Sequence, residues 1–227
     1  MKVLYIDCLG GFTSSMLLGA LIDMGASVAY AEQMSESAGI KTEIYSDRVR
    51  RGGTDAVFAY AKCMGRQTEP EFFSEYELKL RNMCESLGED FAQSDNICTW
   101  LAVLNCIQSF GAECVICSPL ADGSGVDEKT GLPVPGVKTL ELIKMYRIPL
   151  RTLDVCRELI SAEGAAFLGE AADKFGMLPL GSIKCVGYGA GEEEIDGCEN
   201  IVRCVLTETQ EDIFMAEELE KLITEII

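Results

Sequence analysis

Cysteine, and not histidine, supplies the soft and nucleophilic side chains of this chain. Its 227 residues include eleven cysteines and no histidine. Histidine is the commonest metal ligand and the usual general base near neutral pH. Its absence excludes Ser-His and Cys-His nucleophile pairs and every metal site that needs an imidazole. Any chemistry must rest on carboxylates, Lys, Tyr, Cys or a bound cofactor, and the alternative is a chain that does no chemistry.

The cysteines show no spacing typical of a metal site. The one Cys-x-x-Cys is Cys114-Val115-Ile116-Cys117, in a predicted strand where residues three apart point to opposite faces. An odd count also argues against a complete disulfide framework. Cys8 and Cys98 are soft donors that suit a metal, but two isolated cysteines buried in the core are the simpler interpretation.

The N-terminal segment holds the first candidate cofactor site. Asp7 and Cys8 end a predicted strand, Gly10 and Gly11 follow, and Ser15 lies near the start of a predicted helix. Unpaired backbone N–H groups at such a place bind anions. The sequence lacks a full phosphate-loop pattern, so a strand–turn–helix connection with glycine at unusual dihedral angles is the alternative.

Two acidic segments form further candidate sites. Ser118, Asp122 and Ser124 lie in or just before the run 122–128, whose oxygen atoms suit a hard cation. The run lacks calcium-loop spacing, and a solvated surface loop is favoured. Asp95, with Glu89-Asp90 and Cys98 nearby in sequence, is a candidate metal site, against a solvated helix–helix connection.

A third glycine-rich segment, Gly187-Tyr188-Gly189-Ala190-Gly191, follows a predicted strand. It is trailed by Glu192-Glu193-Glu194, which would repel a phosphate, and it does not open a helix. We therefore predict a tight turn over 187–191, and no dinucleotide site.

Charge and hydropathy limit the partners. The formal net charge is −18, which argues against nucleic acid and anionic membranes. No apolar run approaches the roughly 18 residues that span a bilayer. The N-terminus leads directly into a predicted strand and has no signal-peptide pattern. We expect a cytoplasmic protein with mostly reduced cysteines.

The elements that position these residues alternate between strand and helix. Apolar spacing predicts helices near 12–24, 28–38, 71–87, 95–110, 136–146, 162–175 and 211–226, with Thr13 or Ser14 as the first N-cap and Gly176 after the sixth. Strands are predicted near 3–7, 41–49, 55–63, 114–119, 181–188 and 200–206. This order predicts an α/β (or α+β) fold with a mixed sheet flanked by helices.

Four segments carry a family resemblance, in this order: 5–25, with Tyr5-Ile6-Asp7-Cys8 and Gly10-Gly11; 118–142, with Ser118-Pro119-Leu120-Ala121-Asp122-Gly123-Ser124-Gly125 and Gly131-Leu132-Pro133-Val134-Pro135; 158–166; and 187–203. Together they resemble the N-terminal domain of the LarC family, which inserts nickel into the pincer nucleotide cofactor of lactate racemase-type enzymes. The resemblance covers residues 1 to about 206 of a single domain, with 207–227 as a C-terminal amphipathic helix. It implies that the family's C-terminal domain is absent.

The departures from the family fall on its polar residues. Ser15 stands where the family's first loop has Asp, and Thr99 replaces the second Asp of the pair begun by Asp95. The family's His-x-His-Glu falls on 87–90, a His is replaced by Thr130, and a His-rich stretch between 62 and 72 is missing.

The resemblance implies a LarC-like protein related to nickel insertion, with nickel or the pincer nucleotide as its ligand. The departures favour a degenerate homologue that is not competent alone. The alternatives are a non-catalytic nucleotide-binding or scaffold module, and a Cys-dependent redox or soft-metal protein. A homo-oligomer or a separately encoded second-domain partner would fit each of them.

Overall fold

The computed structural model describes residues 1–66, 75–88, 96–127 and 129–210, with the side chains of 75–77 left aside. The described helices are α1 Ser14–Asp23, α2 Val28–Ser37, α3 Glu75–Leu87, α4 Ile97–Phe110, α5 Val137–Met145 and α6 Ala162–Ala171. The described strands are β1 Lys2–Cys8, β2 Ile40–Arg51, β3 Thr54–Arg66, β4 Cys114–Cys117, β5 Leu120–Asp122, β6 Gly125–Val126, β7 Pro133–Val134, β8 Leu150–Thr152, β9 Lys174–Phe175, β10 Ser182–Ala190 and β11 Ile201–Glu208.

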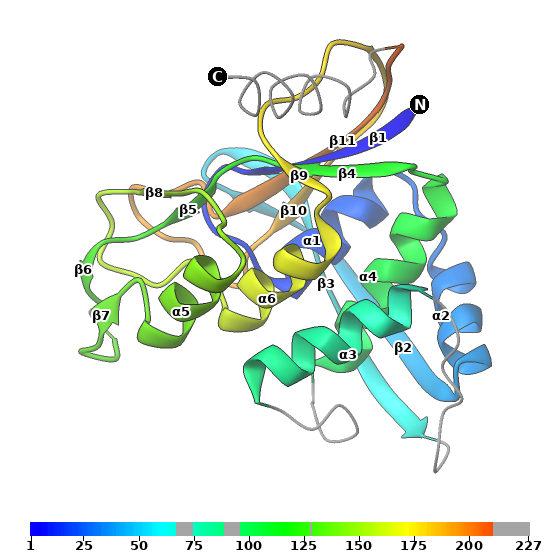
Figure 1. Cartoon of the computed structure of the whole chain (residues 1–227), viewed down its shortest axis with the longest axis horizontal. Helices are drawn as coiled ribbons and strands as arrows, with labels where there is room; N and C mark the ends of the chain where they lie inside the picture. Colours follow the sequence, from blue (N-terminus) through cyan, green and yellow to red (C-terminus); the bar gives the residue numbers. More distant parts are fainter. Residues whose placement is uncertain (67–74, 89–95, 128, 211–227) are drawn as a thin grey trace, which may run out of the picture.

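Seven strands form one mixed sheet in the order β2-β3-β10-β11-β1-β4-β9. β1 pairs in parallel with β4 and antiparallel with β11, and β10 pairs antiparallel with β11 and in parallel with β3. The strand pairs β5–β8 and β6–β7 stand apart from it and lie together on one side of the molecule (Figure 1). The prediction of an α/β fold with a mixed sheet is confirmed.

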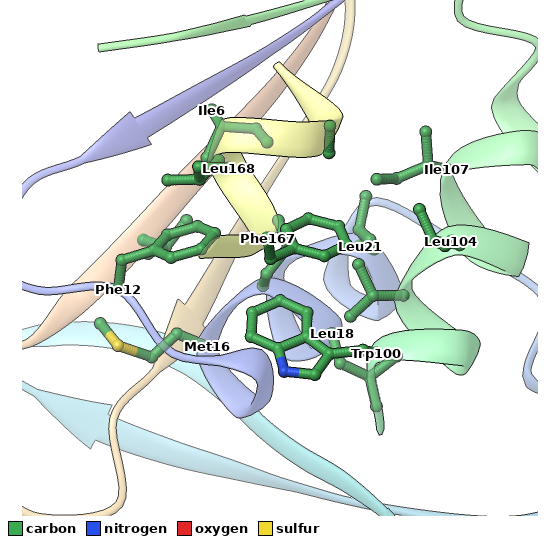
Figure 2. Close-up of a cluster of buried hydrophobic side chains, with 14 of the residues drawn as sticks. Ile6, Phe12, Met16, Leu18, Leu21, Trp100, Leu104, Ile107, Phe167 and Leu168 are labelled. Carbon is green, nitrogen blue, oxygen red and sulfur yellow. The ribbon is translucent and has the colours of Figure 1, made fainter. Parts of the chain in front are cut away.

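One face of the sheet carries the main core. Alternate residues of β1, Leu4, Ile6 and Cys8, join a buried cluster to which all six described helices contribute. At its centre Trp100 of α4 stacks on Phe167 of α6, with ring centroids 4.3 Å apart, and lies 6.2 Å from Phe12 (Figure 2). The other face carries smaller clusters. Among the described residues, no helix has the length and apolarity needed to cross a membrane.

The segment 187–191 is not a tight turn: Gly187 and Gly189 lie inside β10. A Cβ on Gly189 would lie 1.6 Å from the Met16 carbonyl oxygen, and one on Gly187 would lie 2.2 Å from that of Ala20. Helix α1 therefore crosses β10 so closely that no side chain fits between them. Glycine is common in turns, and the local sequence contains no sign that a helix packs on these residues.

The boundaries of the other elements agree in part with those predicted from the sequence. Thr13 is the N-cap of α1, as predicted, and Cys114 and Cys117 pack on opposite faces of the sheet. Helix α6 ends at Ala171, earlier than predicted, because 174–175 form β9 beside β4. Gly176 is therefore not the residue that follows its C-terminus, contrary to the prediction. Residues 207–208 belong to β11, and the predicted helix 211–226 lies outside the described residues.

Candidate functional site

The four segments of the family resemblance meet at the carboxyl end of β1. The Phe12 amide donates to the Leu159 carbonyl (2.9 Å), and the Ser161 amide donates to the Phe12 carbonyl (3.2 Å). Gly11 has φ +102°, and a Cβ there would lie 2.5 Å from the Leu159 oxygen. We call residues 10–12, 122–123, 158–161 and 200–203 the motif junction.

Two buried carboxylates of the second segment bind the backbone of the third. Asp122 Oδ1 accepts from the amides of Leu159 (2.7 Å) and Gly123 (2.8 Å). Asp127 Oδ2 accepts from the Glu158 amide (3.1 Å) and lies 3.4 Å from Arg157 Nε. Both residues are buried, so the solvated loop expected over 122–128 is wrong for them. Their role is to hold 157–159 in place.

The pKa values of these two carboxyl groups are shifted in opposite directions. Burial raises the pKa of Asp122 to about 6, against the opposing effect of the two amides, and its Oδ2 is buried without a hydrogen-bond partner in the described structure. The amides of Thr130 and Glu158 lower the pKa of Asp127 to about 2. In a chain without histidine, Asp122 is thus a group that changes charge close to neutral pH.

The fourth segment closes the motif junction around Gly10. The Gly10 amide donates to the Ile201 carbonyl (3.3 Å), and a Cβ on Gly10 would lie 2.6 Å from Cys198 Sγ. Asn200, which has φ +46°, donates from Nδ2 to the Glu193 carbonyl (2.7 Å). The amides of Gly10 and Phe12 are therefore already bonded to backbone carbonyls within the protein.

Asp7 and Cys8 point to opposite faces of the sheet, as neighbouring strand residues do. Cys8 lies in the main core. Asp7 is paired in register with Arg203 and forms an ion pair with its guanidinium. Arg203 also forms a side-chain hydrogen bond with Tyr188, its partner in register on β10. The structure therefore does not bring Asp7 and Cys8 to one ligand.

Two arginines flank the end of β1. Arg203 keeps 40% of its side chain exposed. Arg151, an exposed residue, donates from Nη2 to the Leu9 carbonyl (3.0 Å). A guanidinium carries five N–H donors, so each can bond more than one acceptor. Arg203 ends the fourth segment of the resemblance, but nothing in the sequence pointed to Arg151, which lies in β8 and reaches the end of β1 only in the fold.

The predicted serines have different places. Ser118 Oγ accepts from the Cys8 amide (2.9 Å) and so joins the ends of β1 and β4. Ser124 Oγ donates to the Leu153 carbonyl (2.9 Å). Ser15 is half-buried in the first turn of α1. All three lie on segments that border the motif junction.

The soft candidate ligands are not isolated. Cys8 Sγ lies 3.7 Å from Cys117 Sγ, and the Cys98 thiol forms a hydrogen bond with the Cys63 thiol. Both Cys8 and Cys98 are buried, as the core interpretation expects. Asp95, with Glu89 and Asp90, lies outside the described residues. Within the described ranges, no group of three or more Cys, Asp or Glu side chains is arranged to hold a metal ion.

Comparison with known proteins gives a consistent assignment. The family model described as "Nickel insertion protein" matches residues 4–87 and 85–226. A pyridinium-3,5-bisthiocarboxylic acid mononucleotide nickel insertion protein of Acetivibrio thermocellus is 26% identical, over all of this chain and 65% of its own length. Putative nickel insertion proteins of Methanothrix thermoacetophila and a Synechococcus are 28% and 29% identical, over 92% and 86% of this chain and 60% and 58% of their own lengths.

This chain thus spans about three fifths to two thirds of the length of these relatives. No solved structure matches it. The family model covers nearly the whole sequence, including all four segments of the motif junction. The chain belongs to the nickel insertion protein family.

Proposed function

We propose that this chain binds the pyridinium mononucleotide substrate of nickel insertion at the motif junction, and that it is a degenerate member that does not complete the insertion alone. The observation that carries this proposal is the meeting of four distant segments at the carboxyl end of β1. Ligands of open α/β sheets bind at the carboxyl ends of strands. The name of the relative from Acetivibrio thermocellus gives a pyridinium mononucleotide together with nickel insertion.

Charge favours the same place. A mononucleotide with two thiocarboxylic acid groups is an anion, and a chain of net charge −18 repels it unless cations gather locally. Arg151 beside the motif junction and Arg203 within it provide two such cations, of which Arg203 is also paired with Asp7. A guanidinium binds phosphate or carboxylate groups through two parallel hydrogen bonds.

The second half of the proposal rests on the donor atoms of the chain. Nickel accepts imidazole readily, but this sequence has no histidine. The thiocarboxylates of the substrate bring their own sulfur ligands, so the task left to the protein is to hold the nucleotide. The metal then reaches it from solution or from a second polypeptide.

Calorimetry on the reduced protein tests both halves. We expect the mononucleotide to bind, R151Q to weaken binding by about tenfold through loss of a charged hydrogen bond, and K184Q to leave it unchanged. Lys184 is a matched control, since it is an exposed cation paired with Glu208 at the other end of β10. Failure of the wild type to bind, or equal losses in both variants, would overturn the nucleotide site.

Nickel is titrated separately. We expect no stoichiometric binding of Ni²⁺ to the reduced chain alone. Tight stoichiometric binding that disappears on replacing Cys8, Cys98 or Asp95 would refute the degenerate assignment.

A further inference from the structure

A cluster of two thiols and a guanidinium lies where the end of β3 meets the start of α4. Arg66 forms hydrogen bonds with both Cys63 and Cys98, and the two free thiols also form a hydrogen bond with each other. Cys63 is exposed, whereas Cys98 is buried in the first turn of α4. The cluster thus has one thiol open to reagents and a second directly behind it.

The backbone holds the two elements together at this point. Thr99 Oγ1 accepts from the Ala61 amide (3.1 Å) and lies 3.3 Å from the Ala61 carbonyl oxygen. Ala61 is two residues before Cys63 and on the same face of β3, and Thr99 follows Cys98. These contacts hold β3 against the start of α4 independently of the sulfur atoms.

We propose that Cys63 and Cys98 form a reactive dithiol, which exchanges with low-molecular-weight disulfides and closes a bond between β3 and α4. The inference does not depend on the proposed function, because its residues lie outside the motif junction.

The charges around Cys63 favour its thiolate. Partial loss of water raises the pKa of Cys63, but hydrogen bonds from Arg66, the Gly65 amide and Cys98 outweigh this effect, so its pKa is below the ordinary value. Burial, followed by the charge of Cys63, raises the pKa of Cys98. One sulfur therefore serves as the nucleophile and its neighbour keeps a proton.

The same charges argue against a metal. The guanidinium of Arg66 and the positive end of the 14-residue helix α4 both repel a cation, and Arg66 also favours the thiolate of Cys63. Two sulfur atoms are also fewer than the four ligands of a usual thiolate metal site. Thiol chemistry is the use that fits this cluster.

A second pair of neighbouring cysteines, Cys8 and Cys117, lacks the features that make Cys63 reactive. Its sulfur atoms are only 3.7 Å apart. Both residues are buried in the main core, however, and burial raises the pKa of Cys117 well above the ordinary value. Proximity alone therefore does not make a reactive thiol; exposure and a neighbouring cation are needed.

The reaction balances with a disulfide of the glutathione type as oxidant. The Cys63 thiolate attacks one sulfur of the reagent, which forms a mixed disulfide and releases one glutathione thiolate. Cys98 then loses its proton to solvent and attacks the Cys63 sulfur, releasing the second glutathione. The protein loses two hydrogen atoms, and one reagent disulfide becomes two thiols.

Oxidised glutathione and peptide mass spectrometry test this sequence of steps. In the wild type we expect a Cys63–Cys98 disulfide that dithiothreitol reverses, and in C98S a glutathione adduct that persists on Cys63. A stable adduct on Cys63 in the wild type, or a Cys63 that does not react, overturns the proposal.

Alkylation rates give a measurement on the intact wild-type protein. Cys156 is the matched control, because it is a second exposed cysteine. With iodoacetamide at neutral pH we expect Cys63 to react faster than Cys156, and R66Q to slow Cys63 about threefold or more while Cys156 is unchanged. Equal rates at the two cysteines, or no effect of R66Q on Cys63, would contradict the role of Arg66.

Discussion

Replacing Asp122 with Asn should change the pH dependence of stability in a defined direction. Burial raises the pKa of Asp122 in the folded protein to about 6, from 3.8. The folded state therefore holds this proton more tightly than the unfolded state does. The stabilisation from the protonated form is fully present below about pH 4 and is lost as the pH rises through 6.

The magnitude follows from the two pKa values. At about 1.4 kcal/mol per pKa unit, the full loss is about 3 kcal/mol, of which about 2 kcal/mol falls between pH 4.5 and 7.5. Asn keeps an oxygen for the amides of Leu159 and Gly123 but has no charge to gain. The free energy of unfolding of D122N, relative to the wild type, should therefore rise by about 2 kcal/mol over that interval.

Urea unfolding followed by circular dichroism at pH 4.5 and 7.5 measures this difference. D127N is the matched control: the amides of Thr130 and Glu158 hold the pKa of Asp127 at about 2, below its ordinary value. Its ionised form stabilises the fold above about pH 4 and loses that effect only towards pH 2, so D127N should show no slope in the interval. A D122N difference that stays constant or falls with pH would refute the reasoning.

Two further predictions concern the backbone around the motif junction and the sheet. G11A should destabilise the protein by about 2 kcal/mol more than G25A: both glycines have φ +102°, but only at Gly11 would a Cβ meet a neighbour, the Leu159 oxygen. Thermal unfolding compares the two, and equal losses would show that φ strain alone decides. T99V should cost about 1–3 kcal/mol in urea unfolding because it leaves the Ala61 amide without its acceptor; an unchanged midpoint would mean that water replaces the hydroxyl.

Local sequence features predicted most elements. Thr13, the N-cap of α1, and Gly111, the left-handed residue that ends α4, act on neighbours within one helical turn, so their signals are complete in the sequence. Alternation in 114–117 correctly placed its two cysteines on opposite faces. The predictions that failed depend on distant partners: β9 follows α6 because it pairs with β4.

Several residues of the candidate site were predicted singly, but their proximity in space was not. Gly11 and Asp122 were identified, but nothing in their spacing shows that they meet at the Leu159 backbone. Asp122 seemed a solvated acid because carboxylates usually are; amide donors of 157–161 allow it to be buried.

The contact between two cysteines that are distant in the sequence was likewise not predictable. Cys63 and Cys98 are 35 positions apart in the sequence, so no spacing rule connects them. They meet because β3 passes the start of α4 at Ala61 and Thr99. Whether a thiol is inert or reactive then depends on Arg66, which spacing could not reveal either.

The place of β1 in the sheet has a consequence for synthesis. β1 is an interior strand whose neighbours are β4 and β11, and the Met1 amino group donates to the Thr209 carbonyl (2.9 Å). At about 5–20 residues per second, a ribosome reaches β11 about 10–40 s after it has made β1. One edge of an apolar strand stays unpaired for that time, which is a risk for aggregation. The sheet is completed only when nearly all of the described chain has left the ribosome, so chaperone depletion should reduce the yield of folded protein more than it changes its stability.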